Sequence, residues 1–366
     1  MKKQANPSVK LRSISIENYK GIDSLTLNFP APQLPHEPDI LIMGSENGLG
    51  KTSVLECSAL LLACLCIRKN RKTLKVQHIS QNAVDLLIQA GSDTTKISGN
   101  IMINDDVLNL TIQLSRNGVL TITSEEKSIL EKYEYHFHHP HVDGNNPNFY
   151  MDDLLARICG FFPEPVIHNP FILFHSYRKV QEGNVGLDML VNAQQSSISG
   201  VSKTPLSEFK HRILRSLMNQ AGLFEFSSED DPEKIINTLN ILAEDYAGGT
   251  ISNKLKASAD NTVEIQIDPV DGSASYGLDG LSSGQKEMIS TLFLMWEQTK
   301  DNPSVVFIDE PELHLNAQWH RSVINTLFRL APRNQYICAT HSEDIMASVS
   351  KEHRILLLND KGNGNV

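Results

Sequence analysis

The sequence predicts an α/β fold in which the two ends of the chain build one domain and the middle forms an α+β insertion. A buried strand, a glycine-containing loop and a helix follow one another over residues 39–67. A second series of buried strands and helices fills residues 286–358. Because the middle lacks this character, we expect residues 1–125 and 269–366 to form the two halves of the domain. Residues 126–268 are expected to form the insertion, mainly of helices and loops.

Composition narrows the class of protein. The chain has 366 residues, of which 40% are hydrophobic and 21% charged, as is typical of a globular protein. Its formal net charge of −10 argues against a protein that coats DNA. No apolar run reaches the length of about 20 residues that crosses a membrane, and no signal peptide follows the basic N-terminus. The 5 cysteines have no CxxC spacing and fit reduced thiols, so we expect a cytoplasmic protein without a membrane partner.

The N-terminal elements follow from periodicity. Residues 11–17 and 24–29 alternate apolar and polar side chains, which predicts a hairpin of half-buried strands. The apolar run at 39–43 predicts a buried strand, and the run from 51 to 67 predicts a helix. Residues 96–123 alternate again and are broken by Asn-Asp and Asn-Gly turns, which predicts antiparallel strands.

The C-terminal elements are equally regular. Residues 286–299 and 316–331 predict helices. Residues 304–309, 336–340 and 354–358 predict short buried strands. No heptad pattern is sustained over several turns, so we expect no long coiled coil.

The glycine loop has the composition of a phosphate-binding loop. Such a loop turns backbone N–H groups toward phosphates, and its lysine and hydroxyl groups reach phosphate and Mg²⁺. The candidate nucleotide-binding residues are Asn47, Gly48, Gly50, Lys51, Thr52 and Ser53, with Thr52 also the candidate Mg²⁺ ligand. One departure is visible, because the pattern G-x-x-x-x-G-K-T requires glycine at position 45. The chain has Ser45 there and Gly44 one residue earlier, so we expect a distorted entry to the loop.

Two further strand ends carry candidate residues for metal binding and catalysis. In FIDEPELHL, residues 307–315, an apolar strand delivers Asp309 toward Mg²⁺ and Glu310 as the base that activates a water for attack on the γ-phosphate. In ATHSEDI, residues 339–345, a strand ends before His341, which is a candidate to touch the γ-phosphate or the attacking water. Asp309 is therefore the candidate metal residue beside Thr52, and Glu310 and His341 are the candidate catalytic residues.

A fourth motif, LSSGQKE, stands at the start of the helix predicted over residues 286–299. Backbone N–H groups and the helix dipole favour an anion at such a helix start. The candidate signature residues are Ser282, Ser283, Gly284 and Gln285.

In their order along the chain, NGLGKT, LSSGQ, DEPELHL and THS, the motifs resemble the ABC-type ATPases, specifically the branch of the RecF, SMC and OLD proteins. The resemblance implies a P-loop ATPase head, a mixed sheet with flanking helices, that binds ATP and Mg²⁺. It implies a head-to-head dimer in which the signature of one copy completes the ATP site of the other. It gives His341 the role of the switch histidine, and it makes Gln181 a weak candidate for a glutamine loop.

The stretch FHSYRKVQEGN, residues 174–184, is similar to one in the ATPases of Septu (PtuA-like) and retron anti-phage defence systems. This resemblance implies a separate effector nuclease of the HNH type, and a retron reverse transcriptase or nucleic-acid complex as a further partner. The chain shows no nuclease motif of its own.

Two alternatives remain open at this point. The basic run at residues 68–75 favours a DNA repair or recombination ATPase, like RecF and SMC proteins, that binds DNA directly. The departure at Ser45 leaves room for a scaffold that binds ATP as a structural ligand and hardly hydrolyses it.

Overall fold

The structure is a computed structural model, and it divides the chain into two compact units. The first unit comprises Met1–Ser176, Gln298–Glu312 and Ala317–Val366, and the second comprises Tyr177–Glu297 and Leu313–Asn316. The described residues are 7–34, 37–45, 48–66, 73–76, 79, 81–137, 170–176, 185–186, 205–220, 232–257, 262–313 and 315–357. The domain boundaries expected at residues 125 and 268 stay a prediction.

A parallel sheet of five strands forms one layer of the first unit, in the order β15-β3-β14-β13-β8. The strands are β3 (Asp39–Ser45), β8 (Phe171–Phe174), β13 (Val305–Asp309), β14 (Gln335–Thr340) and β15 (Arg354–Leu357). Every residue of β8, β13 and β14 is buried, as expected for a parallel sheet covered on both faces. The four predicted strands of this sheet are confirmed. Strand β8 comes from the middle of the chain and was not anticipated.

An antiparallel sheet of six strands forms a second layer, in the order β2-β1-β5-β6-β7-β4. Its strands are β1 (Val9–Tyr19), β2 (Ile22–Asn28), β4 (Thr73–Val76), β5 (Thr94–Ile103), β6 (Asp106–Ser115) and β7 (Leu120–Ser124). The pairing of β1 with β2 confirms the N-terminal hairpin, and the pairing of β5, β6 and β7 confirms the antiparallel strands.

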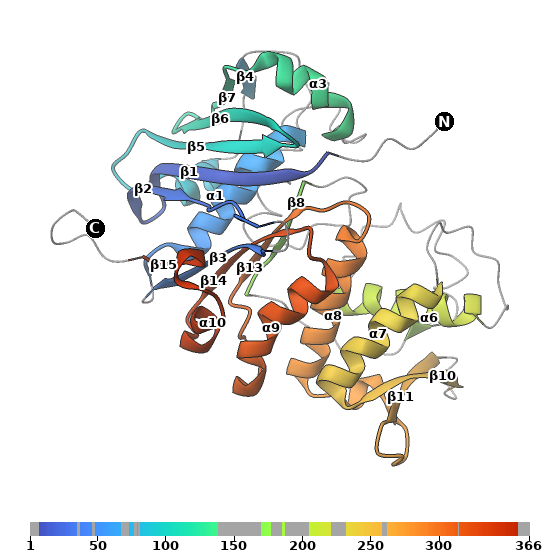
Figure 1. Ribbon diagram of the computed structural model, residues 1–366. Helices are drawn as coiled ribbons and strands as arrows, with labels where there is room; N and C mark the ends of the chain where they lie inside the picture. Colours follow the sequence, from blue (N-terminus) through green and yellow to red (C-terminus); the bar gives the residue numbers. More distant parts are fainter. Residues whose placement is uncertain are drawn as a thin grey trace. The chain divides into compact units, whose positions relative to one another are not determined.

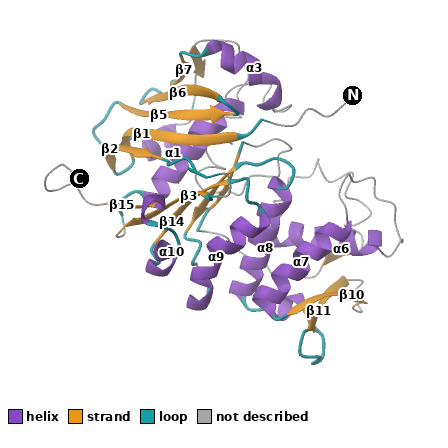
Figure 2. Ribbon diagram, viewed as in Figure 1, coloured by secondary structure: helices purple, strands orange, loops and turns teal. Residues whose placement is uncertain are grey.

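Helix α1 (Lys51–Ala63) contacts strands of both sheets and occupies the core between them (Figures 1 and 2). Its residues from Val54 to Ala63 are all buried, which fits a helix that is apolar on every side. Its one charged residue in this stretch, Glu56, accepts hydrogen bonds from the Lys20 ammonium at 2.6 Å and the Tyr19 hydroxyl at 3.2 Å. The β1–β2 hairpin is thereby anchored to the central helix.

The two sheets are joined by the side chain of Gln335, the first residue of β14. Leu11 pairs with Ile101 of β5, but the pairing of β1 with β2 begins only at Ser13, so Leu11 has no ladder partner on β2. The buried side-chain amide of Gln335 hydrogen-bonds both backbone groups of Leu11. It accepts from the Leu11 N–H at 2.7 Å and donates to the Leu11 carbonyl at 2.8 Å. The next residue, Arg12, forms a two-pronged ion pair with Asp39 of β3. Leu11 and Arg12, the extra residue at the register shift between β1 and β5, therefore attach the antiparallel sheet to the parallel sheet.

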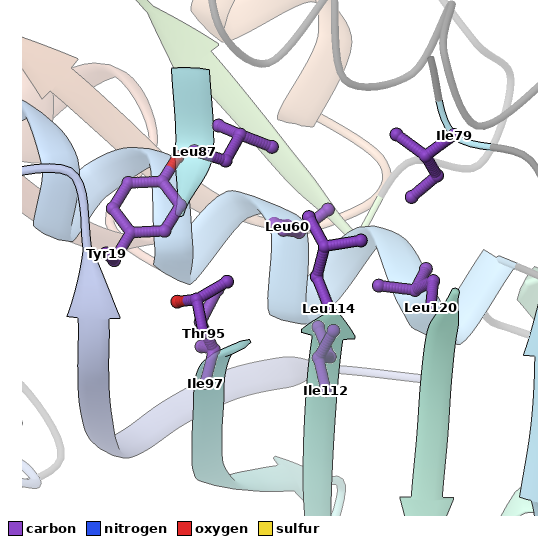
Figure 3. Close-up of a pocket in the computed structure, with 9 residues that line it drawn as sticks. All are labelled: Tyr19, Leu60, Ile79, Leu87, Thr95, Ile97, Ile112, Leu114 and Leu120. Carbon is purple, nitrogen blue, oxygen red and sulfur yellow. The ribbon is translucent and has the colours of Figure 1, made fainter. Parts of the chain in front are cut away.

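A small cavity lies inside the apolar core of this unit (Figure 3). It is lined by Tyr19, Leu60, Ile79, Leu87, Thr95, Ile97, Ile112, Leu114 and Leu120. The Thr95 hydroxyl already donates a hydrogen bond to the Glu17 carbonyl. The surface that the lining residues present to the cavity is therefore apolar. We interpret the cavity as a packing defect of the core.

The remaining elements of the first unit surround these sheets. They are η1 (Cys64–Cys66), α2 (Gln81–Leu87), α3 (Lys127–Phe137), α9 (Ala317–Leu330), α10 (Glu343–Ala347) and η3 (Lys351–His353). Helices α1 and α9 confirm two of the predicted helices.

The second unit combines helices with a small antiparallel sheet. Its elements are β9 (Val185–Gly186), α6 (Pro205–Gln220), α7 (Pro232–Ala247), β10 (Gly249–Ala257), β11 (Thr262–Pro269), β12 (Tyr276–Gly277), η2 (Leu278–Gly280) and most of α8 (Ser283–Thr299). Helix α6 packs on α8 through the rings of Phe209 and Phe293, whose centroids are 5.5 Å apart. Helix α8 confirms the predicted helix and, with 17 residues, is the longest in the described part of the chain. None of the described helices combines the length and apolar character needed to span a membrane.

We predict that Gln335→Leu lowers the free energy of unfolding by about 2–5 kcal/mol, because it leaves two buried backbone groups of Leu11 without partners. Urea unfolding measures the effect. The control is Gln113→Leu on the exposed side of β6, which should change stability by less than about 0.5 kcal/mol. Equal unfolding midpoints for the two variants would contradict the assigned role of Gln335.

Candidate functional site

The loop before α1 is shaped by two glycines with left-handed backbones. Gly48 has φ 83° and Gly50 has φ 84°, a conformation that costs other residues about 1–2 kcal/mol. Gly50 is the N-cap of α1 and offers no side chain that would take up the first N–H groups of the helix. A side chain at Gly50 would also collide with Ile22 of the hairpin, since an added Cβ would lie 2.9 Å from its Cγ1. The helix start therefore presents backbone donors suited to an anion.

The departure at Ser45 has a simple backbone explanation. Ser45 is the last residue of β3 and pairs with Leu357 of β15, so a glycine conformation is not needed there. The strand is regular through this residue, and the expected distortion does not arise at position 45. Gly44 serves packing instead, because an added Cβ would lie 3.0 Å from the Met346 sulfur. Asn47 lies outside the described residues.

Thr52 and Asp309 meet at the carboxyl edge of the parallel sheet. The Thr52 hydroxyl donates to both carboxylate oxygens of Asp309, at 3.1 and 3.0 Å. Asp309 is buried at the end of β13, and Thr52 stands in the first turn of α1, followed by Ser53. A hydroxyl and a carboxylate side by side, next to a phosphate-binding helix start, are the oxygen donors that Mg²⁺ prefers. The residues present therefore fit the metal that the fold implies.

Glu310 adopts an unusual backbone conformation directly after Asp309. Its φ is 50°, and its N–H donates to the Ala339 carbonyl at 2.8 Å, which stabilises this turn. Such strain in a residue other than glycine is typical of functional sites. Burial raises the pKa of Glu310 above its ordinary value, and the Asp309 and Glu312 carboxylates raise it further. The side chains of His341 and Lys51 oppose this rise.

His341 lies between the lysine of the loop and the glutamate of the acidic strand. Its Nδ1 is 3.4 Å from the Lys51 Nζ, and its Nε2 is 3.8 Å from the Glu310 Oε1. Burial lowers the pKa of Lys51, while the carboxylates of Asp309, Glu310 and Glu312 oppose that change. Residues from three distant segments of the chain thus converge on one charged cluster.

Glu312 belongs to this cluster and was missed by the sequence analysis. Its carboxylate accepts a hydrogen bond from the Thr340 hydroxyl at 2.7 Å and from the His341 N–H at 2.6 Å. The signal was present as the second glutamate of DEPE, but the direction of a side chain three residues past a strand end cannot be read from the sequence. A second missed residue, His320 of α9, places its Nδ1 3.0 Å from the Ser342 hydroxyl.

The signature residues are in the second unit and form a capping box at the start of α8. The Ser282 hydroxyl accepts from the Gln285 N–H at 3.3 Å, and the Gln285 side chain accepts from the Ser282 N–H at 2.9 Å. The Gln285 amide also donates to the Tyr246 carbonyl of α7. Gly284 is buried, whereas the Ser283 side chain is exposed. Two of the four candidates are therefore already engaged within their own unit.

The structure brings together five predicted residues of the first unit: Lys51, Thr52, Asp309, Glu310 and His341. Gln181 and residues 68–72 of the basic run lie outside the described residues. Residues 73–75 belong to β4, of which only the backbone is described.

A phosphate loop, a hydroxyl–carboxylate pair and an acidic strand followed by a histidine define the class of nucleotide-hydrolysing P-loop proteins. Comparison with known families agrees with this class. Residues 10–346 match the family described as AAA ATPase domain, and the chain belongs to that family of ATPases.

Two curated relatives are similar to the chain at low identity. Septu protein PtuA of Bacillus thuringiensis is 22% identical over 363 residues, which cover 95% of this chain and 75% of that protein. The retron Vc95 probable ATPase of Vibrio cholerae serotype O1 biovar El Tor is 22% identical over 170 residues. That match covers 44% of this chain and only 32% of the relative. The resemblance to defence-system ATPases is confirmed at this level.

Two solved structures share the fold. A SmcHead bound to the C-winged helix domain of ScpA has a TM-score of 0.51 at 14% identity and covers 92% of each chain. An Smc head domain derived from Pyrococcus furiosus, with an extended coiled coil and bound to the C-terminal domain of ScpA, has a TM-score of 0.50 at 13% identity. It covers 93% of this chain and 92% of that one. The predicted fold class, an ABC-type ATPase head, is thereby confirmed.

Proposed function

We propose that this chain hydrolyses ATP with Mg²⁺, that two copies close on the nucleotide, and that the ATPase regulates a separate effector nuclease in anti-phage defence. The observation that carries the ATPase part is the convergence of Lys51, Thr52, Asp309, Glu310 and His341 at one sheet edge. The curated relatives named for Septu and retron systems support the defence part.

In this proposal each residue of the cluster has one task. The N–H groups at Gly48 and Gly50 and the Lys51 ammonium hold the phosphates. Thr52 and Asp309 hold Mg²⁺, which when bound neutralises charge on the phosphate oxygens. Glu310 accepts the proton of the attacking water, a task that its raised pKa favours because a more basic carboxylate takes a proton more readily. His341, beside both Lys51 and Glu310, orients the water or the γ-phosphate.

The proposed dimer uses the signature at the start of α8. The exposed Ser283 and the backbone donors of the helix start would meet the phosphates held by the partner copy. The capping box of Ser282 and Gln285 keeps that helix start in one conformation. The resemblance to ABC-type ATPases supports an arrangement of two heads around two ATP molecules.

We expect Glu310→Gln to lower ATP turnover by about 10²- to 10⁴-fold while ATP still binds, because only the proton acceptor is lost. Turnover is measured by phosphate release, and binding by titration with a fluorescent ATP analogue. The control is Glu343→Gln, an exposed carboxylate in the first turn of α10, which should retain wild-type turnover. Equal, substantial turnover by wild type and Glu310→Gln would overturn the assignment of Glu310 as the base. Negligible turnover by both, with ATP bound, would favour the scaffold that binds ATP as a structural ligand.

Mixing two inactive variants tests the dimer. Lys51→Ala removes the phosphate lysine and Ser283→Arg blocks the signature, so each variant alone should be inactive. An equal mixture should recover about a quarter of wild-type turnover, because half of the dimers are mixed and each of these has one intact site.

The matched control mixes Lys51→Ala with Glu310→Gln. These residues share one site in the first unit, so no arrangement of mixed heads restores an intact site. Recovery in this control, or its absence in the first mixture at every ratio, would overturn the dimer.

DNA binding separates the effector proposal from the DNA repair alternative. With a net charge of −10, the isolated chain should bind duplex DNA weakly even at low salt. In a mixture with the candidate HNH nuclease, DNA cleavage should differ between the wild type and Glu310→Gln when ATP is added. Tight, salt-dependent DNA binding that is lost when the basic residues at 68–75 are neutralised would favour the alternative.

A further inference from the structure

We propose that Glu312 is a positioning residue that sets the switch histidine, His341, in its place for ATP hydrolysis. The inference rests on the proposed ATPase function and extends it to a residue to which the sequence analysis gave no role. It starts from the contacts of one carboxylate.

Both oxygens of Glu312 are used, and both bonds go to the same short segment. Oε1 accepts from the His341 backbone N–H at 2.6 Å, and Oε2 accepts from the Thr340 hydroxyl at 2.7 Å. Bonds to an ionised carboxylate at these lengths are about twice as strong as neutral ones. Because Thr340 is fully buried, this end of the segment cannot shift easily.

Hydrogen bonds also fix Ser342, the residue that follows His341. The Ser342 N–H donates to the Thr340 hydroxyl at 2.9 Å, so the Thr340 proton is free to point at Glu312. The Ser342 hydroxyl lies 3.0 Å from the Nδ1 of His320 on α9. The backbone on each side of His341 is therefore tied, and its ring can lie at hydrogen-bonding distance from Lys51 and near Glu310.

The negative charge of Glu312 favours a role in positioning His341 over a role in nucleotide binding. It adds a third carboxylate beside Asp309 and Glu310, in a site meant for phosphates. A negative charge there opposes an anionic ligand, so its presence weakens nucleotide affinity. A positioning role therefore predicts that neutralising Glu312 leaves ATP binding unchanged or tighter while it slows turnover.

The test is a double-mutant cycle with Glu312→Gln and His341→Ala, measured as kcat, KM and ATP affinity. Glu312→Gln alone should lower kcat by about tenfold or more without raising KM, as expected when a reacting group is misplaced. In the His341→Ala background the same substitution should change kcat by less than about twofold, since its effect passes through the histidine. Equal factors in both backgrounds would overturn the proposal.

Variants of Thr340 control for folding. Thr340→Ser keeps the hydroxyl that Glu312 accepts from and should retain most of the turnover. Thr340→Val has nearly the same shape without the hydroxyl, and it should reproduce part of the kcat loss with an unchanged KM. Thermal unfolding of all variants shows whether they are folded. A loss of ATP affinity in folded Glu312→Gln would assign Glu312 to binding and refute positioning.

Failure of the proposed ATPase function would give a different set of results. If wild type binds ATP but does not turn it over, and Glu310→Gln behaves identically, the ATPase proposal fails before the cycle is reached. If wild type turns over and the cycle is additive, only the role of Glu312 is refuted.

Discussion

The candidate site depends on the register of strand β14, because β14 lies between the strand before the phosphate loop and the acidic strand. Its Thr340 is level with Gly44 of β3, and its Ala339 is level with Asp309 of β13. Parallel strands end at the same edge of a sheet, so the loop, the acidic strand and the switch segment must emerge together. A slip of one residue would turn the side chain of Asp309 to the opposite face and away from Thr52.

The other end of β14 explains why the N-terminal hairpin is part of the nucleotide-binding unit. There, Gln335 hydrogen-bonds both backbone groups of Leu11, which has no ladder partner on β2, across 324 positions of sequence. The hairpin then reaches the phosphate loop, where Ile22 lies so close to Gly50 that only glycine fits. The ion pair between the partly buried Lys20 and the buried Glu56 fixes the hairpin on the helix that follows the loop. Through its β1–β2 hairpin, the antiparallel sheet thus stabilises the conformation of the phosphate loop.

Sequence reasoning was strongest where periodicity and motif chemistry agree. The apolar runs around Asp309 and before Lys51 gave strands in the correct places, and their motifs converge in space. It failed for β8, because the four residues at Phe171–Phe174 are too short a run to distinguish from a loop next to a helix. It also missed Glu312, whose partners are 28 and 29 positions away in sequence and depend on how one turn folds back. Such contacts are set by tertiary structure and leave no local pattern.

The charges of the site indicate a cluster that is electrostatically balanced only together with a metal ion and a nucleotide. Three carboxylates, Asp309, Glu310 and Glu312, act on the Lys51 ammonium, and burial of Lys51 disfavours its charge. Burial raises the pKa of Glu310, and repulsion by the carboxylates of Asp309 and Glu312 raises it further, which means that charge on Glu310 is electrostatically unfavourable in this cluster. A divalent cation beside Asp309 would relieve that repulsion, and phosphates near Lys51 would stabilise its charge. Metal and nucleotide should therefore bind cooperatively, each reducing the electrostatic cost that the other would meet alone.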